Sequence, residues 1–188
     1  MLHHPHNTGN RCGSFQLAAI VALLFVFWTL PEGASGQTKP SSRGMKIGII
    51  GSGNIGGTVG TLWVKAGYQV LFSSRNQENL KQLVDGLGPL ARAGTVQQAL
   101  AFGDVIFIGV PYGAYPQIGK DYASQFNDKI VLDAGNAVPA RDGEIANEAR
   151  AIGIGNTSAK YLPGARIVRA FNTMNFRRLA SNANRSGE

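Results

Sequence analysis

The chain has 188 residues, which is enough for one domain of ordinary size with a hydrophobic core. Its 44% hydrophobic and 15% charged residues exclude a disordered chain, and its net charge of +7 comes from scattered Lys and Arg residues, which favours an anionic small ligand over nucleic acid. The one cysteine, Cys12, lies near the N-terminus, so the rest of the chain holds no disulfide framework and no cysteine-based zinc site.

The N-terminal segment has the three-part pattern of a secretory signal. A polar stretch containing Arg11 precedes the apolar run QLAAIVALLFVFWTL, and Pro31 and the small residues EGASGQ follow it. The run is short for a membrane span, which needs about 20 apolar residues. We therefore expect residues 1–36 to be a signal peptide, with an uncleaved membrane anchor as the alternative, and residues 37–44 to be a linker.

This pattern predicts an exported or periplasmic protein. Cleavage after Gly36 would suit the small residues at that point. The alternative is that Met45, which stands directly before the first predicted strand, is the true start of a cytoplasmic protein. Contact with a membrane is expected only through the N-terminal segment, if that segment is not cleaved.

A glycine-rich turn opens the predicted globular domain, residues 45–188. The apolar run MKIGII predicts a buried parallel strand, the motif G-x-G-x-x-G follows at Gly51, Gly53 and Gly56, and NIGGTVGTLWVKAG then predicts a helix. In this motif the first glycine allows the tight turn, the second lets a pyrophosphate approach the backbone, and the third lets helix and strand pack closely. The placement of the motif between strand and helix indicates a dinucleotide site.

The next predicted strand, in YQVLFSSRN, carries the signal for the type of dinucleotide. An NAD-binding domain places an acidic residue at the end of this strand, where it binds the ribose hydroxyls. Here Ser73, Ser74 and Arg75 stand there instead. Hydroxyls and a guanidinium suit a 2′-phosphate, so the sequence predicts NADP(H) as the cofactor.

Strands and helices alternate through the remaining chain. Buried strands are predicted in DVIFIGV, DKIVLDAGN and ARIVRAFNTM, and helices in QENLKQLVDGLG, after Thr95, in GAYPQIGKDYASQF and in EIANEARAIG. Thr95 and Gln98 form a predicted capping box. This alternation predicts an α/β protein with a Rossmann-type, doubly wound parallel sheet.

Ligand sites in such sheets lie beyond the carboxyl ends of the strands. Pro111 and Tyr112 stand at one such end, where they would cover the cofactor or form a structural turn, and Asn136 would bind the nicotinamide or its ribose or serve as a turn residue. Asn172 and Thr173 would meet a second substrate or cap a helix. Asp133 is interpreted as loop structure.

The sequence predicts no catalytic side chain and no metal site. No histidine lies beyond His6, and no Ser-His-Asp or Cys-His set is present. Hydride transfer between a cofactor and an acceptor needs no such group, because it requires only that the two be held in contact.

Five stretches together resemble the NADPH:coenzyme F-420 (deazaflavin) oxidoreductase family, whose domain also occurs in the six-transmembrane metalloreductases. They are KIGIIGSGNIGG, FSSRN, VIFIGVPYGAY, IVLDAGNAV and LPGARIVRAFNTM. The resemblance implies that Ser52, Asn54 and Ile55 contribute phosphate contacts and that Ser74 and Arg75 bind the 2′-phosphate. It also implies that Pro111 flanks the nicotinamide.

The resemblance implies an oxidoreductase that transfers hydride between NADP(H) and a small-molecule acceptor, with coenzyme F-420 as the expected acceptor. Family members continue after the FNT stretch with elements that wall the acceptor site, so we expect this chain to lack those C-terminal elements. The alternative is a truncated NADP-binding module without turnover. A reductase of the pyrroline-carboxylate or 6-phosphogluconate type would need a helical second domain. A homodimer is left open.

Overall fold

The computed structural model describes residues 44–183, apart from the side chain of Gln77. The predicted signal peptide or anchor (1–36) and the linker, apart from Gly44, lie outside the described residues and stay predictions.

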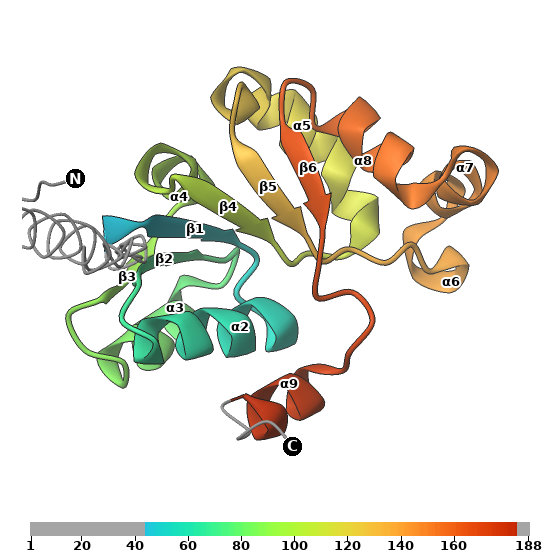
Figure 1. Ribbon diagram of the computed structural model, residues 1–188. Helices are drawn as coiled ribbons and strands as arrows, with labels where there is room; N and C mark the ends of the chain where they lie inside the picture. Colours follow the sequence, from blue (N-terminus) through green and yellow to red (C-terminus); the bar gives the residue numbers. More distant parts are fainter. Residues whose placement is uncertain (1–43, 184–188) are drawn as a thin grey trace, which may run out of the picture. The chain divides into compact units, whose positions relative to one another are not determined.

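The described chain forms one parallel sheet of six strands in the order β3-β2-β1-β4-β5-β6 (Figure 1). The strands are β1 (Lys46–Ile50), β2 (Gln69–Ser73), β3 (Ala91–Gly94), β4 (Val105–Ile108), β5 (Ile130–Asp133) and β6 (Arg166–Arg169). The order runs outward from β1 in one direction and from β4 in the other, so the topological switch point lies between these two strands. The predicted Rossmann-type fold is confirmed.

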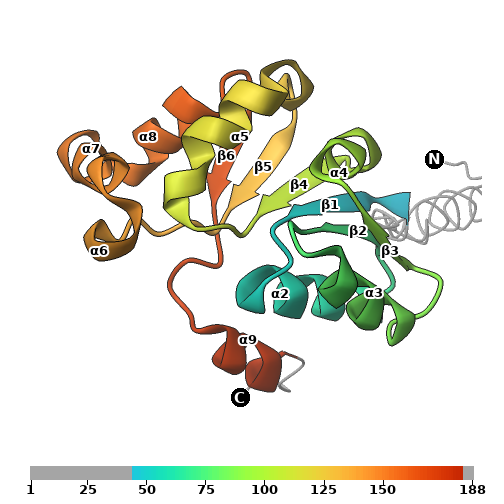
Figure 2. The ribbon, with the colours of Figure 1, turned by 180° about the vertical axis from the view of Figure 1, so that it is seen from behind.

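Helices lie on both faces of the sheet, as Figures 1 and 2 show from opposite sides. They are α2 (Asn54–Lys65), α3 (Gln77–Asp85), α4 (Val96–Phe102), α5 (Tyr115–Tyr122), α6 (Pro139–Asp142), α7 (Glu144–Ile152), α8 (Ile154–Tyr161) and α9 (Phe176–Asn182), with short 3-10 turns at η3 (Tyr112–Ala114) and η4 (Ala123–Phe126). Helix α9 packs beside α2. The helices α8 and α9 and the strand β3 were not predicted from the sequence, and they continue the predicted alternation of strands and helices.

Two hydrophobic clusters hold the layers together. One gathers Ile50, Ile106 and Phe126 with residues of α7, and the other gathers Ile49, Phe72 and neighbours on the opposite side of the sheet. The central strands contribute fully buried aliphatic and aromatic side chains to both, as expected for parallel strands that are covered on two faces. The sheet therefore gives its strand ends a rigid base.

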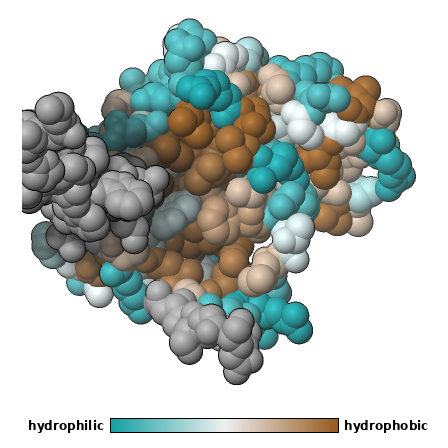
Figure 3. Space-filling model, in the orientation of Figure 1, coloured by the Kyte–Doolittle hydropathy of each residue, from teal (hydrophilic) through white to brown (hydrophobic). Residues whose placement is uncertain are grey.

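Figure 3 shows exposed apolar side chains on one face of the described chain. Apolar side chains gather there over the strands, between α9 and the helices on the far side of the sheet. On β6 the alternate positions are exposed, and Val168 keeps 46% of its surface accessible.

Candidate functional site

The turn between β1 and α2 is fixed by the first and third glycines of its motif. Gly51 has φ +93°, and a Cβ there would lie 2.5 Å from Val110 Cγ1. A Cβ on Gly56 would lie 2.1 Å from the carbonyl oxygen of Gly51. The backbone N–H groups of Gly51 and Ser52 both donate to the Ser73 carbonyl oxygen at 3.0 Å. The turn is thus locked to the end of β2, and Gly56 serves the close packing predicted for it.

The second glycine, Gly53, has a different environment. It precedes α2 in an extended conformation (φ −77°, ψ −155°), and a Cβ built on it would meet no atom within 4 Å. No side chain caps the helix at this end. The first N–H groups of a helix have no partner within the helix, and together with the helix dipole they favour an anion. Open space at Gly53 is what a bound phosphate requires.

Two cavities meet at this glycine turn. The larger, about 790 Å³, extends toward the end of β2 and the start of α5, and the smaller, about 560 Å³, extends toward the ends of β5 and β6. Residues common to both are Gly53, Gly109, Val110, Pro111 and Arg141. A further cavity of about 560 Å³ lies between α2, α3 and α9 and also includes Gly53. The three cavities therefore border one another around the glycine turn, at the carboxyl ends of the strands.

The loop after β2 borders the larger cavity through Ser74 and Arg75. Arg75 is exposed, and within residues 44–183 its guanidinium forms no hydrogen bond or ion pair. Ser74 Oγ accepts a hydrogen bond from the Asn76 N–H at 3.2 Å. Arg75 thus presents an unpaired cation to the cavity, as its predicted role requires.

Ser73 occupies a different place from the predicted one. It is fully buried, and its hydroxyl donates to the Ile49 carbonyl oxygen at 2.6 Å. Its own carbonyl oxygen accepts from the Ser52 hydroxyl at 3.0 Å, as well as from the two N–H groups of the turn. Ser73 therefore supports the glycine turn, and its hydroxyl does not reach the cavity.

Residues at the α2 N-terminus and at the ends of β4 and β5 line the smaller cavity. They are Asn54, Ile55, Pro111 and Asn136, of which Pro111 also borders the larger cavity. The Asn136 side-chain amide donates to the Asn172 carbonyl oxygen at 2.7 Å. The structure thus places the residues predicted to bind the nicotinamide, Pro111 and Asn136, in the same cavity as two predicted phosphate contacts, Asn54 and Ile55.

The segment after β6 closes one side of the smaller cavity. Phe171, Asn172 and Phe176 contribute to its wall, whereas Thr173 lines none of the three cavities. The helix-capping alternative belongs to Asn175, whose side-chain oxygen accepts from the Arg177 N–H at 2.9 Å. Of the pair predicted to meet a second substrate, only Asn172 is in position.

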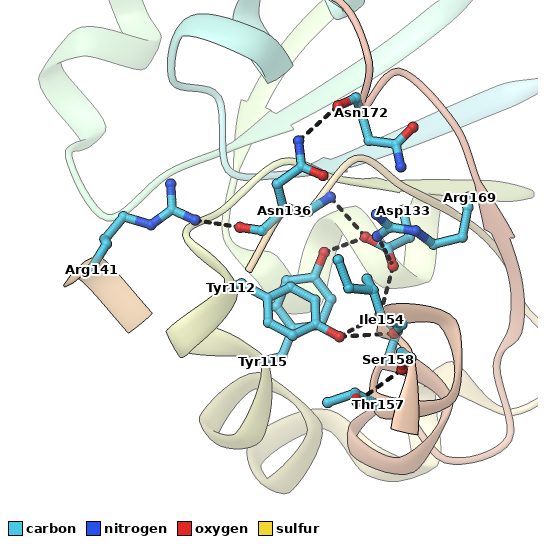
Figure 4. Close-up of polar contacts among 12 residues, drawn as sticks. Tyr112, Tyr115, Asp133, Asn136, Arg141, Ile154, Thr157, Ser158, Arg169 and Asn172 are labelled. Carbon is cyan, nitrogen blue, oxygen red and sulfur yellow. Dashed lines mark hydrogen bonds and ion pairs between the residues drawn. The ribbon is translucent and has the colours of Figure 1, made fainter. Parts of the chain in front are cut away.

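Tyr112 belongs to the core and does not cover the cavities. It is fully buried, and its hydroxyl lies 2.9 Å from both the Ile154 carbonyl oxygen and Ser158 Oγ (Figure 4). Burial raises the pKa of the Tyr112 hydroxyl. Of the two alternatives for Tyr112, the structural one holds.

Asp133 anchors a buried polar network at the end of β5. Tyr115 donates to its Oδ1 at 2.6 Å, while Ser158 and Arg169 donate to its Oδ2 at 2.6 and 2.7 Å (Figure 4). The Gly135 N–H also donates to Oδ1, at 2.8 Å. The carboxylate is fully satisfied, so its role is structural, but Asp133 is the last residue of β5 and not part of a loop as predicted. Burial and the nearby Asp133 charge raise the pKa of Tyr115 well above its usual value.

Arg141, which the sequence analysis missed, borders both main cavities. Its Nε and Nη2 donate to Asp142 Oδ1 and Oδ2 at 2.9 and 2.8 Å, and Nη2 also donates to the Asn136 carbonyl oxygen at 2.6 Å. Asp142 accepts from the backbone N–H groups of Gly113 and Val138 at 3.0 and 2.7 Å. The sequence signal was the RDG stretch shortly after a strand end.

The Arg141 pair predicts a pH-dependent stability. The Arg141 hydrogen bonds, followed by the two backbone N–H groups, lower the pKa of Asp142 from 3.8 to about 2. Because the folded state binds this proton more weakly than the unfolded chain, the pair stabilises the fold above pH 4, and this contribution is lost as the pH falls toward 2. We expect the pair to contribute about 1–2 kcal/mol to the free energy of unfolding, since water screens the half-exposed arginine. Urea unfolding at pH 5 and pH 2.5 measures it, and Asp142→Asn should lose that part of the dependence; an unchanged pH dependence would contradict the assignment.

Within residues 44–183, no group of three or more His, Cys, Asp and Glu side chains is arranged to hold a metal ion. The helices of that part of the chain include none that is both long and apolar enough to cross a membrane.

Residues 46–137 match the family described as NADP oxidoreductase, coenzyme F420-dependent. This segment contains every residue predicted to bind the cofactor. The metalloreductase STEAP3 of Rattus norvegicus is 29% identical to the chain over 134 residues, which are 69% of this chain and 25% of that protein. The chain thus spans about a quarter of the length of this curated relative.

Two solved structures share the fold. A candidate F420-dependent NADP-reductase from Arthrobacter sp. FB24 is 20% identical with a TM-score of 0.62, over 73% of this chain and 67% of that one. A hypothetical protein from Sinorhizobium meliloti is 28% identical with a TM-score of 0.55, over 72% and 65% of the two chains. The matching family is described as one of NADP oxidoreductases. The resemblance to the coenzyme F420-dependent NADP oxidoreductases is therefore confirmed over residues 46–137.

Proposed function

We propose that this protein binds NADP(H) across the switch point of its sheet and transfers hydride between the nicotinamide and a small-molecule acceptor. The observation that carries the proposal is the junction of two cavities at Gly53, where backbone space is open in front of the α2 N-terminus. A dinucleotide has two halves joined by a pyrophosphate, and the two cavities joined at a helix N-terminus match that shape and charge.

Each half of the cofactor has suitable partners. Ser74 and Arg75 would hold the 2′-phosphate in the larger cavity, where no acidic side chain follows β2 to favour NAD. Pro111 and Asn136 would flank the nicotinamide in the smaller cavity. When bound there, the nicotinamide supplies or accepts the hydride, and the protein binds, orients and shields it.

The smaller cavity suits an acceptor that needs no proton transfer from the protein. Its lining includes the apolar Phe171, Met174 and Phe176 together with asparagines, and Arg141 is the one ionisable residue among the lining residues described. A planar acceptor would stack against this lining while hydride moves directly, and the proton that a deazaflavin takes up together with the hydride would come from water. We propose a deazaflavin of the coenzyme F-420 type as the acceptor, and the description of the matching family supports this choice.

A second candidate function is an NADP-binding module without turnover. Met174 lines the smaller cavity yet is 43% exposed, so the rim of the acceptor space is open to water. Oxidation of NADPH, followed at 340 nm with the deazaflavin present, separates the two functions. Binding of NADPH without oxidation would favour the module.

Replacement of Arg75 by alanine tests the cofactor preference. We expect the variant to bind NADPH more weakly by about 1–3 kcal/mol, the range for charge-assisted hydrogen bonds, and to bind NADH almost as the parent does. Titration calorimetry with both cofactors measures the difference. Arg150→Ala is a matched control, because Arg150 is exposed on α7 and lines none of the cavities. Equal loss for NADPH and NADH would refute the assignment of Arg75.

A further inference from the structure

Arg141 lies at the junction of the two main cavities. Five residues border both cavities, and four of them are glycine, valine or proline. Arg141 is the charged one, and it comes from α6, which follows β5, whereas Gly53 precedes α2. A ligand that occupies both cavities would therefore contact residues from both segments.

The guanidinium of Arg141 is held in a fixed orientation. Asp142 binds it through two parallel hydrogen bonds, and the Asn136 carbonyl oxygen binds it through a third. Asp142 is itself fixed, because its side chain is inaccessible to solvent and accepts from two backbone N–H groups. Such bidentate pairing orients an arginine as well as binding it.

One nitrogen of this guanidinium remains available. Nη1 has no hydrogen-bond partner among the residues that the structure describes, and Figure 4 shows this end of the side chain directed away from Asn136. The Arg141 side chain keeps 47% of its surface exposed. The arginine therefore offers two unused N–H donors at the cavity junction, in an orientation that its neighbours have already set.

We propose that Arg141 binds the pyrophosphate of the dinucleotide, at the cavity junction that it shares with Gly53. This inference rests on the proposed function, since it needs a dinucleotide that spans both cavities. The pyrophosphate is the central part of such a ligand, so its place is at the residues that both cavities share. The α2 N-terminus supplies backbone donors to this group, and Arg141 supplies charged side-chain donors.

The pyrophosphate role predicts a pattern of affinities opposite to that of Arg75. Arg141→Ala should weaken the binding of NADPH and the binding of NADH by the same factor, about ten- to a hundredfold, as expected for the loss of charge-assisted hydrogen bonds. It should change the affinity for adenosine 2′-monophosphate, which lacks a pyrophosphate, by less than about twofold. Titration calorimetry with these three ligands gives the pattern, Arg150→Ala is the control, and thermal unfolding shows whether each variant folds.

The role of Asp142 as a positioning residue is tested in the same assay. Asp142→Asn should weaken the binding of NADPH when it is introduced into the parent. It should have little further effect in the Arg141→Ala background, because Asp142 acts through the arginine. A purely structural role for Asp142 would give the same loss in both backgrounds.

The outcomes separate this inference from the proposed function. If Arg141→Ala binds NADPH and NADH as the parent does, the pyrophosphate role is overturned while NADP(H) binding stands. A selective loss for NADPH, or a change confined to the acceptor KM, overturns it as well. If the parent binds neither cofactor, the proposed function itself fails.

Discussion

Replacing Gly53 by valine is expected to abolish NADPH binding while the domain stays folded. The fold tolerates a side chain here, because a Cβ meets nothing within 4 Å and the extended backbone is open to any residue. The same side chain would occupy the space where a phosphate approaches the α2 N-terminus. Loss of two or three charge-assisted hydrogen bonds would weaken NADPH by at least about a hundredfold.

Calorimetry with NADPH measures this loss, and circular dichroism with thermal unfolding reports on the fold. The neighbouring glycines give the contrast. Gly51→Ala and Gly56→Ala should destabilise the domain itself, because a Cβ at either position collides with fixed backbone atoms. If Gly53→Val binds NADPH like the parent, the phosphate lies elsewhere.

The largest effect on stability is expected from Asp133→Ala. The substitution removes the acceptor of four hydrogen bonds and leaves Arg169, which is only 23% exposed, without its counter-ion. Removing one partner of a buried ion pair costs about 3–5 kcal/mol, because the remaining charge and donors are left unsatisfied. Urea unfolding at neutral pH gives the change in the free energy of unfolding.

Asp85→Ala is the matched control for this measurement. Its carboxylate pairs with Lys81 at 2.8 Å on the exposed face of α3, with side-chain exposures of 60% and 79%. Water screens an exposed pair of this kind, so its removal should change the free energy of unfolding far less than the removal of Asp133 does. Similar losses for the two variants would show that Asp133 is not the anchor of a buried network.

The sequence predicted the fold well where the local signals agreed with the tertiary structure. The buried run of β1, the glycine motif and the capping box of Thr95 and Gln98 all appear as expected. Strand β3 was missed because its sequence ARAG has no apolar alternation and its two middle positions are exposed. The α8 helix was missed because Gly153, with φ +89°, ends α7 and a second helix starts at once.

For the candidate site, position along the chain was a better guide than side-chain chemistry. Residues at strand ends do gather at one edge, as the parallel topology requires. Whether a polar side chain there faces a ligand or a neighbouring backbone depends on packing, and this separates Arg75 from Ser73. Arg141 was missed because its orientation depends on Asp142 and Asn136, contacts that a linear pattern does not reveal.

The place of Ser73 has a consequence for how such a domain can change its cofactor. Ser73 fastens the glycine turn to the sheet through buried hydrogen bonds, whereas the exposed Arg75 forms no hydrogen bond with this turn in the part of the chain that the structure describes. The proposed phosphate-binding turn and the proposed 2′-phosphate contact at Arg75 are therefore adjacent in sequence but are held in place by different contacts. On the proposed function, selection can alter the exposed Arg75, and with it the preference for NADP, without disturbing the hydrogen bonds that hold the glycine turn.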